Sequence, residues 1–276
     1  MDAINQFIAQ NEPALRLEIF LCVLALMAAL EAVLPRRAGQ NRPNRWPTNL
    51  GLVLIDTGAV RAVAWAMPLF LPVAAAEYAG AQPGGGWGLL PAVGIGGWAA
   101  FILGILILDL AIYAQHLIFH KVPVLWRLHR VHHTDMALDV TSGFRFHPVE
   151  ILLSVAIKTA LVVALGIPGA AVVVFEVILN ATALFNHANL RLTPKLDAAI
   201  RLVLVTPDMH RVHHSVHRDE TDSNFGFNVP WWDRLFGTYR AQPRAGHQDM
   251  QIGISEFRDA DNLRLGSLLT QPLRKD

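Results

Sequence analysis

The chain contains one pentapeptide twice, as His129-Arg-Val-His132-His133 and as His210-Arg-Val-His213-His214. A further pair, His116 and His120, ends a stretch that begins at Asp109. These three clusters hold eight of the twelve histidines. Neutral imidazole is the commonest nitrogen ligand of first-row transition metals, and one ion rarely needs more than about four. The clusters therefore predict two metal sites, and the fold is expected to be one that brings them together.

Helical spacing explains how the clusters could share two ions. Residues four apart lie on one face of a helix, so His116 and His120 can reach the same ion. Asp109, two turns earlier on that face, is a candidate hydrogen-bond acceptor for an imidazole N–H. Adjacent histidines in each pentapeptide point about 100° apart, which lets one helix serve two neighbouring ions. Before the third cluster, Thr206-Pro207-Asp208 combines an N-cap, an N1 proline and an acidic first turn, and predicts a helix start there.

The other four histidines carry weaker signals. His187 ends the last apolar stretch of the chain and is a candidate ninth ligand. His147 precedes a proline, which is typical of a helix start, and His217 follows the third cluster; both are possible additional ligands. His247 is expected at the surface. No His-Glu-x-x-His motif is present, and ligand type alone leaves iron, zinc, copper and manganese open.

Composition places the chain among membrane proteins. Of its 276 residues, 53% are hydrophobic and only 16% are charged, against about 25% charged in a soluble domain. The net charge of +1 gives no reason to expect nucleic acid as a partner. The single cysteine, Cys22, excludes an internal disulfide and an iron–sulfur cluster on this chain alone. Asp2 and Glu12 argue against a signal peptide, so the first apolar run is expected to be a retained membrane helix.

Five apolar stretches are long enough, or nearly so, to cross a bilayer. They are Leu15–Leu34, Leu50–Ala76, Trp98–Phe119, Ile151–Leu165 and Ala170–Phe185. The last two are short and are separated by a turn motif at Gly166–Gly169, which predicts a hairpin. We expect an all-α integral membrane protein with four to five membrane helices and a helical, histidine-rich cap that binds two metals. Residues 1–97 would form the N-terminal membrane helices, 98–247 the catalytic domain and 248–276 a C-terminal tail.

Basic residues predict the orientation. The connector Pro35–Trp46 holds four arginines, whereas Glu77–Trp87 has neither lysine nor arginine. Since basic loops stay on the cytoplasmic side, the N-terminus should lie outside and all the histidine clusters at the cytoplasmic face. Within the hairpin, Lys158 and Glu176 lie at matching distances from the turn, and a structural ion pair is expected there rather than a role in substrate handling. Asp56 and Arg61 are not ideally spaced to pair on one helix.

Further motifs accompany the histidines. They are Trp126-Arg-Leu-His129, His147-Pro-x-Glu150, His187-x-Asn189, Asn224-Phe-Gly226 and Trp232-Asp-Arg-Leu-Phe-Gly-Thr-Tyr239. With them the chain resembles, from about Asp109 to Tyr239, the fatty acid hydroxylase/sterol desaturase superfamily. The resemblance implies a non-haem di-iron monooxygenase of the membrane, with O2 as co-substrate, that hydroxylates or desaturates a lipid or sterol-like molecule. It implies as ligands His116, His120, His129, His132, His133, His187, His210, His213 and His214, and a structural role for Trp232–Tyr239.

The sequence also constrains partners and rival functions. It contains no haem domain and no dinucleotide-binding motif, so electrons are expected from a separate cytochrome b5, ferredoxin or reductase. The expected location is the inner, cytoplasmic membrane. Two other classes remain open: a zinc-dependent membrane lipid hydrolase, and a histidine-rich metal transporter. A transporter predicts ligands spread along the spanning helices, whereas these crowd at one end.

Overall fold

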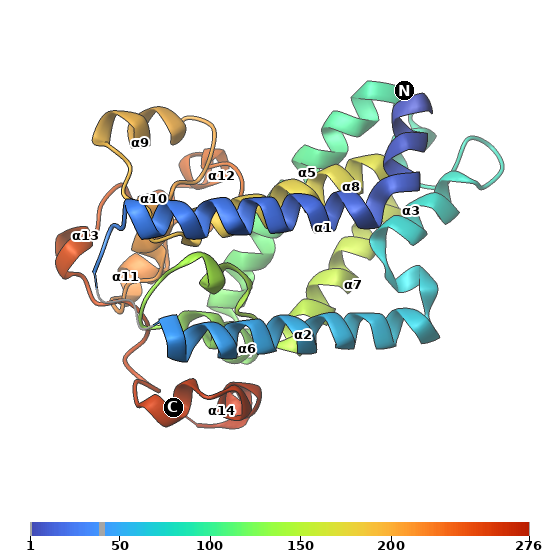
Figure 1. Ribbon diagram of the computed structural model, residues 1–276. Coiled ribbons are helices and arrows are strands. Elements are labelled where there is room, and N and C mark those ends of the chain that lie inside the picture. Colours follow the sequence, from blue (N-terminus) through green and yellow to red (C-terminus); the bar gives the residue numbers. More distant parts are fainter. Residues whose placement is uncertain (1, 39–41, 276) are drawn as a thin grey trace.

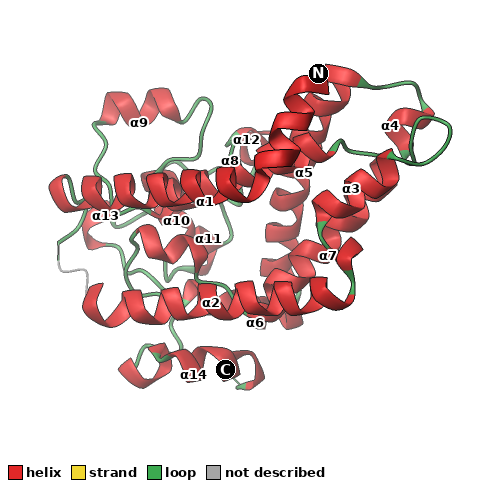
Figure 2. Cartoon of the chain, turned by 45° about the vertical axis from the view of Figure 1, so that its right-hand side comes forward, coloured by secondary structure: helices red, strands yellow, loops and turns green. Residues whose placement is uncertain are grey.

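Long apolar helices run across the molecule, and most of the short helices gather at one end of them (Figure 1). The computed structural model describes residues 2–38 and 42–275. Within these described residues, five helices are long and apolar enough to cross a membrane. They are α1 (Asp2–Val33), α2 (Arg42–Ala66), α5 (Gly97–Lys121), α7 (Pro148–Leu165) and α8 (Gly169–His187). The described residues form no β-strand, only two isolated bridges (Figure 2), so the predicted all-α membrane architecture is confirmed.

Helices α7 and α8 form the predicted hairpin. The turn depends on Gly166, whose φ of 69° lies in the left-handed region. A Cβ at this position would lie 2.5 Å from the carbonyl oxygen of Trp87, so no side chain fits. Helix α8 packs against both α1 and α5, and it is the most buried of the five spans. Its C-terminal residue is His187, which therefore enters the interior where the spans meet the cap.

The second predicted span, Leu50–Ala76, is wrong at both ends. Helix α2 begins at Arg42 and stops at Ala66. A 3-10 turn, η1 (Pro68–Phe70), and a short helix, α3 (Pro72–Gly80), follow it. Proline lacks the N–H that continues a helix, so Pro68 and Pro72 each restart the chain in a new direction. The end of the connector Pro35–Trp46, which was expected to be a loop, thus belongs to α2. Residues 39–41 of this connector lie outside the described residues.

The remaining short helices form the cap, apart from α4 (Leu89–Ala92), which lies with α3 near the opposite end of the spans (Figure 2). In the cap, α6 (Pro123–His133) and α10 (Pro207–His213) carry the two pentapeptides. Thr206 caps α10 by accepting from the Met209 N–H at 3.3 Å, as predicted. The other cap elements are η2 (Val140–Phe144), α9 (Pro194–Ile200), α11 (Arg218–Thr221), α12 (Trp231–Leu235), α13 (Gly246–Asp249), η3 (Ala260–Leu263), α14 (Leu265–Thr270) and η4 (Gln271–Leu273).

An ionic cluster joins three of the spans. The Lys158 ammonium on α7 binds the Glu176 carboxylate on α8, which confirms the predicted pair. Arg16 on α1 also binds Glu176, at 2.6 Å, a partner that the hairpin geometry could not reveal. Asp56 and Arg61 do not pair in the described part of the chain; Asp56 is buried and Arg61 is exposed.

Replacement of Lys158 by methionine is expected to destabilise the protein by less than the about 3–5 kcal/mol typical of an orphaned buried charge, because Arg16 still neutralises Glu176. Thermal unfolding in detergent, followed by circular dichroism, measures the effect. Lys195→Met, at an exposed position of α9, is the matched control. A Lys158→Met protein with unchanged stability but no turnover would contradict the structural role.

Candidate metal centre

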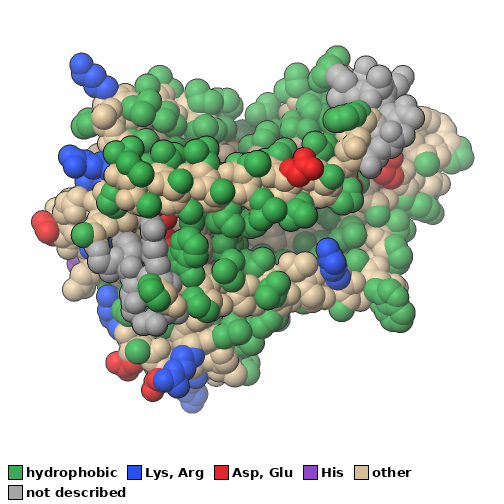
Figure 3. All heavy atoms as spheres, in the orientation of Figure 1, with side chains coloured by type: hydrophobic (Ala, Val, Ile, Leu, Met, Phe, Trp, Pro, Cys, Tyr) green, Lys and Arg blue, Asp and Glu red, His purple; other side chains and the backbone are tan. Residues whose placement is uncertain are grey.

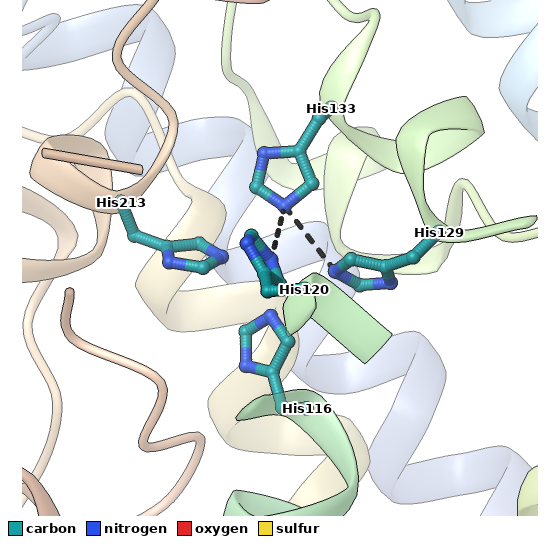
Figure 4. Close-up of side chains that lie close together, drawn as sticks. All are labelled: His116, His120, His129, His133 and His213. Carbon is teal, nitrogen blue, oxygen red and sulfur yellow. Dashed lines mark hydrogen bonds between the residues drawn. The ribbon is translucent and has the colours of Figure 1, made fainter. Parts of the chain in front are cut away.

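Nine buried histidines form two groups of possible metal ligands. Group A consists of five: His116, His120, His129, His133 and His213. Group B consists of four: His132, His187, His210 and His214. Within each group the candidate nitrogen atoms all lie within 4.8 Å of one another. Figure 4 shows the group A rings pointing toward a common centre from different helices.

The two pentapeptide helices each contribute to both groups. On α6, His133 belongs to group A and its neighbour His132 to group B. In the same way, His213 at the end of α10 belongs to group A, and His214, the C-cap of that helix, belongs to group B. This is the division predicted from the angle between adjacent helical residues. The rings of His133 and His214 stack at 4.6 Å between centroids, so the two groups lie side by side.

Six of the nine rings are oriented by an acceptor at Nδ1. Backbone carbonyls serve four of them: Phe225 for His116 at 2.8 Å, Ser223 for His213 at 2.7 Å, Ala183 for His187 at 2.7 Å and Arg145 for His132 at 3.3 Å. Carboxylates serve two more, with Glu150 at 2.6 Å from His129 and Asp222 at 3.3 Å from His120. Carbonyl and carboxylate oxygens only accept, so each Nδ1 carries the proton and each Nε2 keeps its lone pair.

The free lone pairs fit a cation. In group A the Nε2 of His133 lies 3.1 Å from that of His120 and 3.2 Å from that of His129. In group B the Nε2 of His187 lies 3.1 Å from that of His132 and 2.9 Å from that of His210. His132 and His187 both carry the proton at Nδ1, so their Nε2 atoms are both acceptors and cannot bond to each other, and such a buried pair is costly without a positive ion. The donor set therefore suits a transition metal in each group.

Burial keeps the cap histidines neutral. It lowers the pKa of His129 to about 3. For His133 and His214, burial and then the neighbouring imidazoles lower the pKa well below its ordinary value. At neutral pH these rings are therefore uncharged, the state that a metal ligand needs.

Asp109 has a different partner from the one predicted. Its Oδ2 accepts from the Trp232 Nε1–H at 2.7 Å, while the Nδ1 of His116 faces the Phe225 carbonyl. Helical spacing identifies a shared face but not which distant segment covers it. The role that Asp109 was expected to have for a metal-site histidine belongs instead to Glu150, on α7. Its position two residues after a proline, in the motif His147-Pro-x-Glu150, was the available signal.

The three other histidines lie outside both groups. His147 is the N-cap of α7 and accepts from the Val149 N–H at 3.2 Å, so its possible use as a ligand is not supported. His217 is exposed and is likewise absent from both groups. The expectation that His247 lies at the surface is wrong, because it is only 6% exposed and packs 3.7 Å from the Asp208 carboxylate.

The segment Trp232–Tyr239 holds one wall of group A in place. The Asp233 carboxylate accepts the backbone N–H groups of Phe225 and Gly226, each at 2.8 Å. This fixes the loop whose Phe225 carbonyl orients His116. Since Trp232 also ties the segment to α5 through Asp109, the segment positions a candidate ligand without belonging to either group.

A buried ionic network supports the other wall. Arg45 on α2 forms two parallel bonds to Asp135, at 2.7 and 2.6 Å, and binds Asp139 at 2.5 Å. Burial favours the neutral acid at Asp135, but Arg45 and Arg145 outweigh it and lower the pKa to about 2. The network anchors the start of η2, which packs so tightly on α8 that a Cβ at Gly143 would lie 2.6 Å from the Ala183 carbonyl oxygen. The sequence did not reveal this network, because Arg45 was interpreted only as one of the basic residues of the connector Pro35–Trp46.

Two phenylalanines separate the histidines from the apolar spans. Phe146 stacks on His132 at 4.5 Å between centroids. Phe227 lies 5.0 Å from the ring of His116 and 6.0 Å from that of His210, so it contacts one member of each group. Both pack against the largest hydrophobic cluster, which includes Leu108 and Ile112 of α5. The centre therefore has an apolar wall on its membrane side.

Comparison with known proteins gives a consistent result. A family model described as fatty acid hydroxylase matches residues 101–238. The ornithine lipid hydroxylase OlsE of Rhizobium tropici is 28% identical over 245 residues, which cover 85% of this chain and 70% of the relative. Human alkylglycerol monooxygenase is 30% identical over 145 residues, 52% of this chain and 31% of the relative. Rat cholesterol 25-hydroxylase is 29% identical over 146 residues, which cover 52% of this chain and 48% of the relative. The chain therefore spans less than half the length of the alkylglycerol monooxygenase and of the cholesterol 25-hydroxylase. No solved structure matches the chain.

Proposed function

Because the chain belongs to the fatty acid hydroxylase family, whose model matches half of its length, we propose that it is a membrane enzyme that hydroxylates a lipid with O2 and two iron ions. The observation that carries the proposal is the pair of buried, all-imidazole groups beside an apolar wall. Group A would hold one iron and group B the other. When bound, the two ions supply the activation of O2 that attack on an unactivated C–H bond requires.

The protein residues orient the site and keep it dry. The Nδ1 acceptors fix the planes of six of the nine rings, so that their Nε2 atoms already point inward before an ion binds. Phe146 and Phe227 present apolar surface to an alkyl chain entering from the spans, and they exclude water from the reacting end.

Hydroxylation is the favoured reaction. The relatives are named ornithine lipid hydroxylase, alkylglycerol monooxygenase and cholesterol 25-hydroxylase, and these names support oxygen insertion over desaturation. Hydroxylation consumes two electrons and two protons per O2, with one oxygen atom going to the lipid and one to water. A separate electron-transfer protein, a cytochrome b5, ferredoxin or reductase, would supply the electrons. The cap would lie on the cytoplasmic side of the inner membrane with the N-terminus outside, as the positions of Arg36 and Arg37 favour.

The decisive experiment combines metal analysis with isotope labelling. Protein reconstituted with iron is incubated with 18O2, a reductant and total membrane lipid, and the lipids are analysed by mass spectrometry. The expected result is about two irons per chain and a lipid product carrying one 18O. Loss of two hydrogens without added oxygen would indicate desaturation. Zinc in the groups together with lipid hydrolysis in the absence of O2 would overturn the proposal.

Replacement of Glu150 by leucine is expected to weaken iron binding by about 10- to 100-fold, the usual effect of removing the partner of a metal-binding imidazole. The carboxylate accepts from His129 at 2.6 Å, so without it that ring loses both its orientation and some basicity. Glu150→Gln keeps an acceptor oxygen and should lose less affinity. Competition with a chromogenic chelator measures binding directly. Equal, unchanged affinities in both variants would contradict this role.

A further inference from the structure

The cap carries an exposed apolar surface outside the metal centre. We call it the α9–α12 patch; it consists of Leu196 (49% exposed), Leu202 (62%), Val203 (55%), Trp231 (42%), Leu235 (68%) and Phe236 (55%). In Figure 3, apolar side chains gather over α9 and the loop that follows it. Isolated exposed leucines are normal on protein surfaces, but a contiguous group of large apolar side chains marks a contact surface.

Contacts with α5 fix the position of the patch along the spans. Trp232, in α12, bonds Asp109 at 2.7 Å, and Phe236 stacks on Tyr113 at 5.5 Å between ring centroids. Asp109 and Tyr113 lie twelve and eight residues before Lys121, the cap-side end of α5. At about 1.5 Å per residue, they lie about 18 and 12 Å along the helix axis from that end. The hydrocarbon core is about 30 Å thick, so α12 lies at the depth of lipid tails if α5 crosses the bilayer.

The local backbone is suited to such a depth. In hydrocarbon an unpaired carbonyl or N–H costs several kcal/mol. The Trp231 Nε1–H donates to the Leu202 carbonyl at 2.7 Å, and the Arg234 guanidinium donates to the Arg201 carbonyl at 3.0 Å. The N–H groups of Thr238 and Tyr239 both donate to the Asp233 carbonyl. Two side chains of α12 thus form hydrogen bonds with carbonyl groups of the loop between α9 and α10, which have no partner within a helix.

Basic side chains border the patch. Lys195 is exposed on α9 and Arg191 is exposed just before it, and their long side chains can extend from an apolar surface toward headgroups. Anionic headgroups attract such cations at a membrane surface. We propose that the α9–α12 patch inserts into the cap-side leaflet, where lipid tails cover it. The cap then lies partly within the bilayer, and the patch is continuous with the lipid-facing surface of α5.

Site-directed spin labelling tests the proposal independently of metal binding or turnover. In a Cys22→Ser background, single cysteines replace Leu202 or Leu235, and the labelled protein is placed in nanodiscs of phosphatidylethanolamine and phosphatidylglycerol. Collisions with O2 report lipid, and collisions with a water-soluble nickel chelate report water. The references are labels at Leu54 of α2 (74% exposed) and at Asp219 of the cap, whose side chain is 56% exposed.

The expected ratio of O2 to nickel accessibility at Leu202 and Leu235 matches Leu54 and is several-fold above that at Asp219. A ratio like that of Asp219 would place the patch in water and overturn the proposal. Low accessibility to both probes would also overturn it, by showing protein contact; dipolar broadening would then identify a second copy. If the variant labelled at Leu202 or Leu235 elutes abnormally or loses helicity, the label is placed at Val203 instead.

Discussion

Replacement of His187 by alanine is expected to lower the iron content of the protein from about two ions per chain to about one. Group B has only four imidazoles, and the Nε2 of His187 lies within 3.1 Å of two of the others. The five imidazoles of group A are untouched. Turnover should fall by more than the about 10- to 100-fold that loss of a ligand's hydrogen-bond partner costs, because here the ligand itself is removed. Metal analysis after gel filtration measures the first effect and product formation the second.

The matched control is His217→Ala, which removes an exposed histidine that belongs to neither group. It should keep two ions per chain and full turnover. If His187→Ala also kept both ions, then His187 would serve only as a hydrogen-bonded core residue through the Ala183 carbonyl. Loss of both ions in a folded protein would mean that the groups do not bind independently.

Replacement of Arg45 by methionine should destabilise the protein by about 3–5 kcal/mol, the usual cost of leaving a buried charge without its partner. The side chain of Arg45 is 8% exposed, and those of Asp135 and Asp139 are fully buried. Two carboxylates would lose their direct ion-pair partner. Unfolding in mild detergent, followed by circular dichroism and corrected for metal content, measures the loss. Arg61→Met, an exposed arginine on the same helix, is the control and should change stability little.

A second substitution makes the Arg45 result specific. Asp135→Asn in the Arg45→Met background removes one of the two orphaned charges, so part of the stability should return. If the double variant were as unstable as the sum of the single variants, the two side chains would be energetically independent, which would contradict a shared buried network.

Local pattern predicted the features that depend on helical repeats. The angle between adjacent residues on a helix correctly assigned His132 and His133 to different groups, and Thr206-Pro207 correctly located the start of α10. The equal distances of Lys158 and Glu176 from the turn predicted their pairing. In each case the two positions are close in sequence or related by one hairpin, so their separation in space follows from helix geometry.

Long-range packing decided the features that sequence reasoning missed. Asp109 bonds Trp232, 123 residues away, and Arg45 bonds Asp135, 90 residues away. Neither distance is set by a helical repeat. A count of basic residues near Pro35–Trp46 predicts orientation but cannot separate a solvated arginine from a buried one. Hydropathy likewise predicted one continuous helix across Pro68 and Pro72, because both prolines lie in an apolar run.

The division of each pentapeptide between the two groups also has a mechanical meaning. Helices α6 and α10 each present neighbouring residues to both centres, while α5 and α8 each contribute to one. The two bound ions would cross-link four helices. They would join segments far apart in the chain, such as those of His132 and His187, which are 55 residues apart. A tilt of α6 or α10 would then strain both centres together. If the proposed ions bind, they would also stabilise the tertiary structure, and the protein without metal should be less rigid at the boundary between cap and spans.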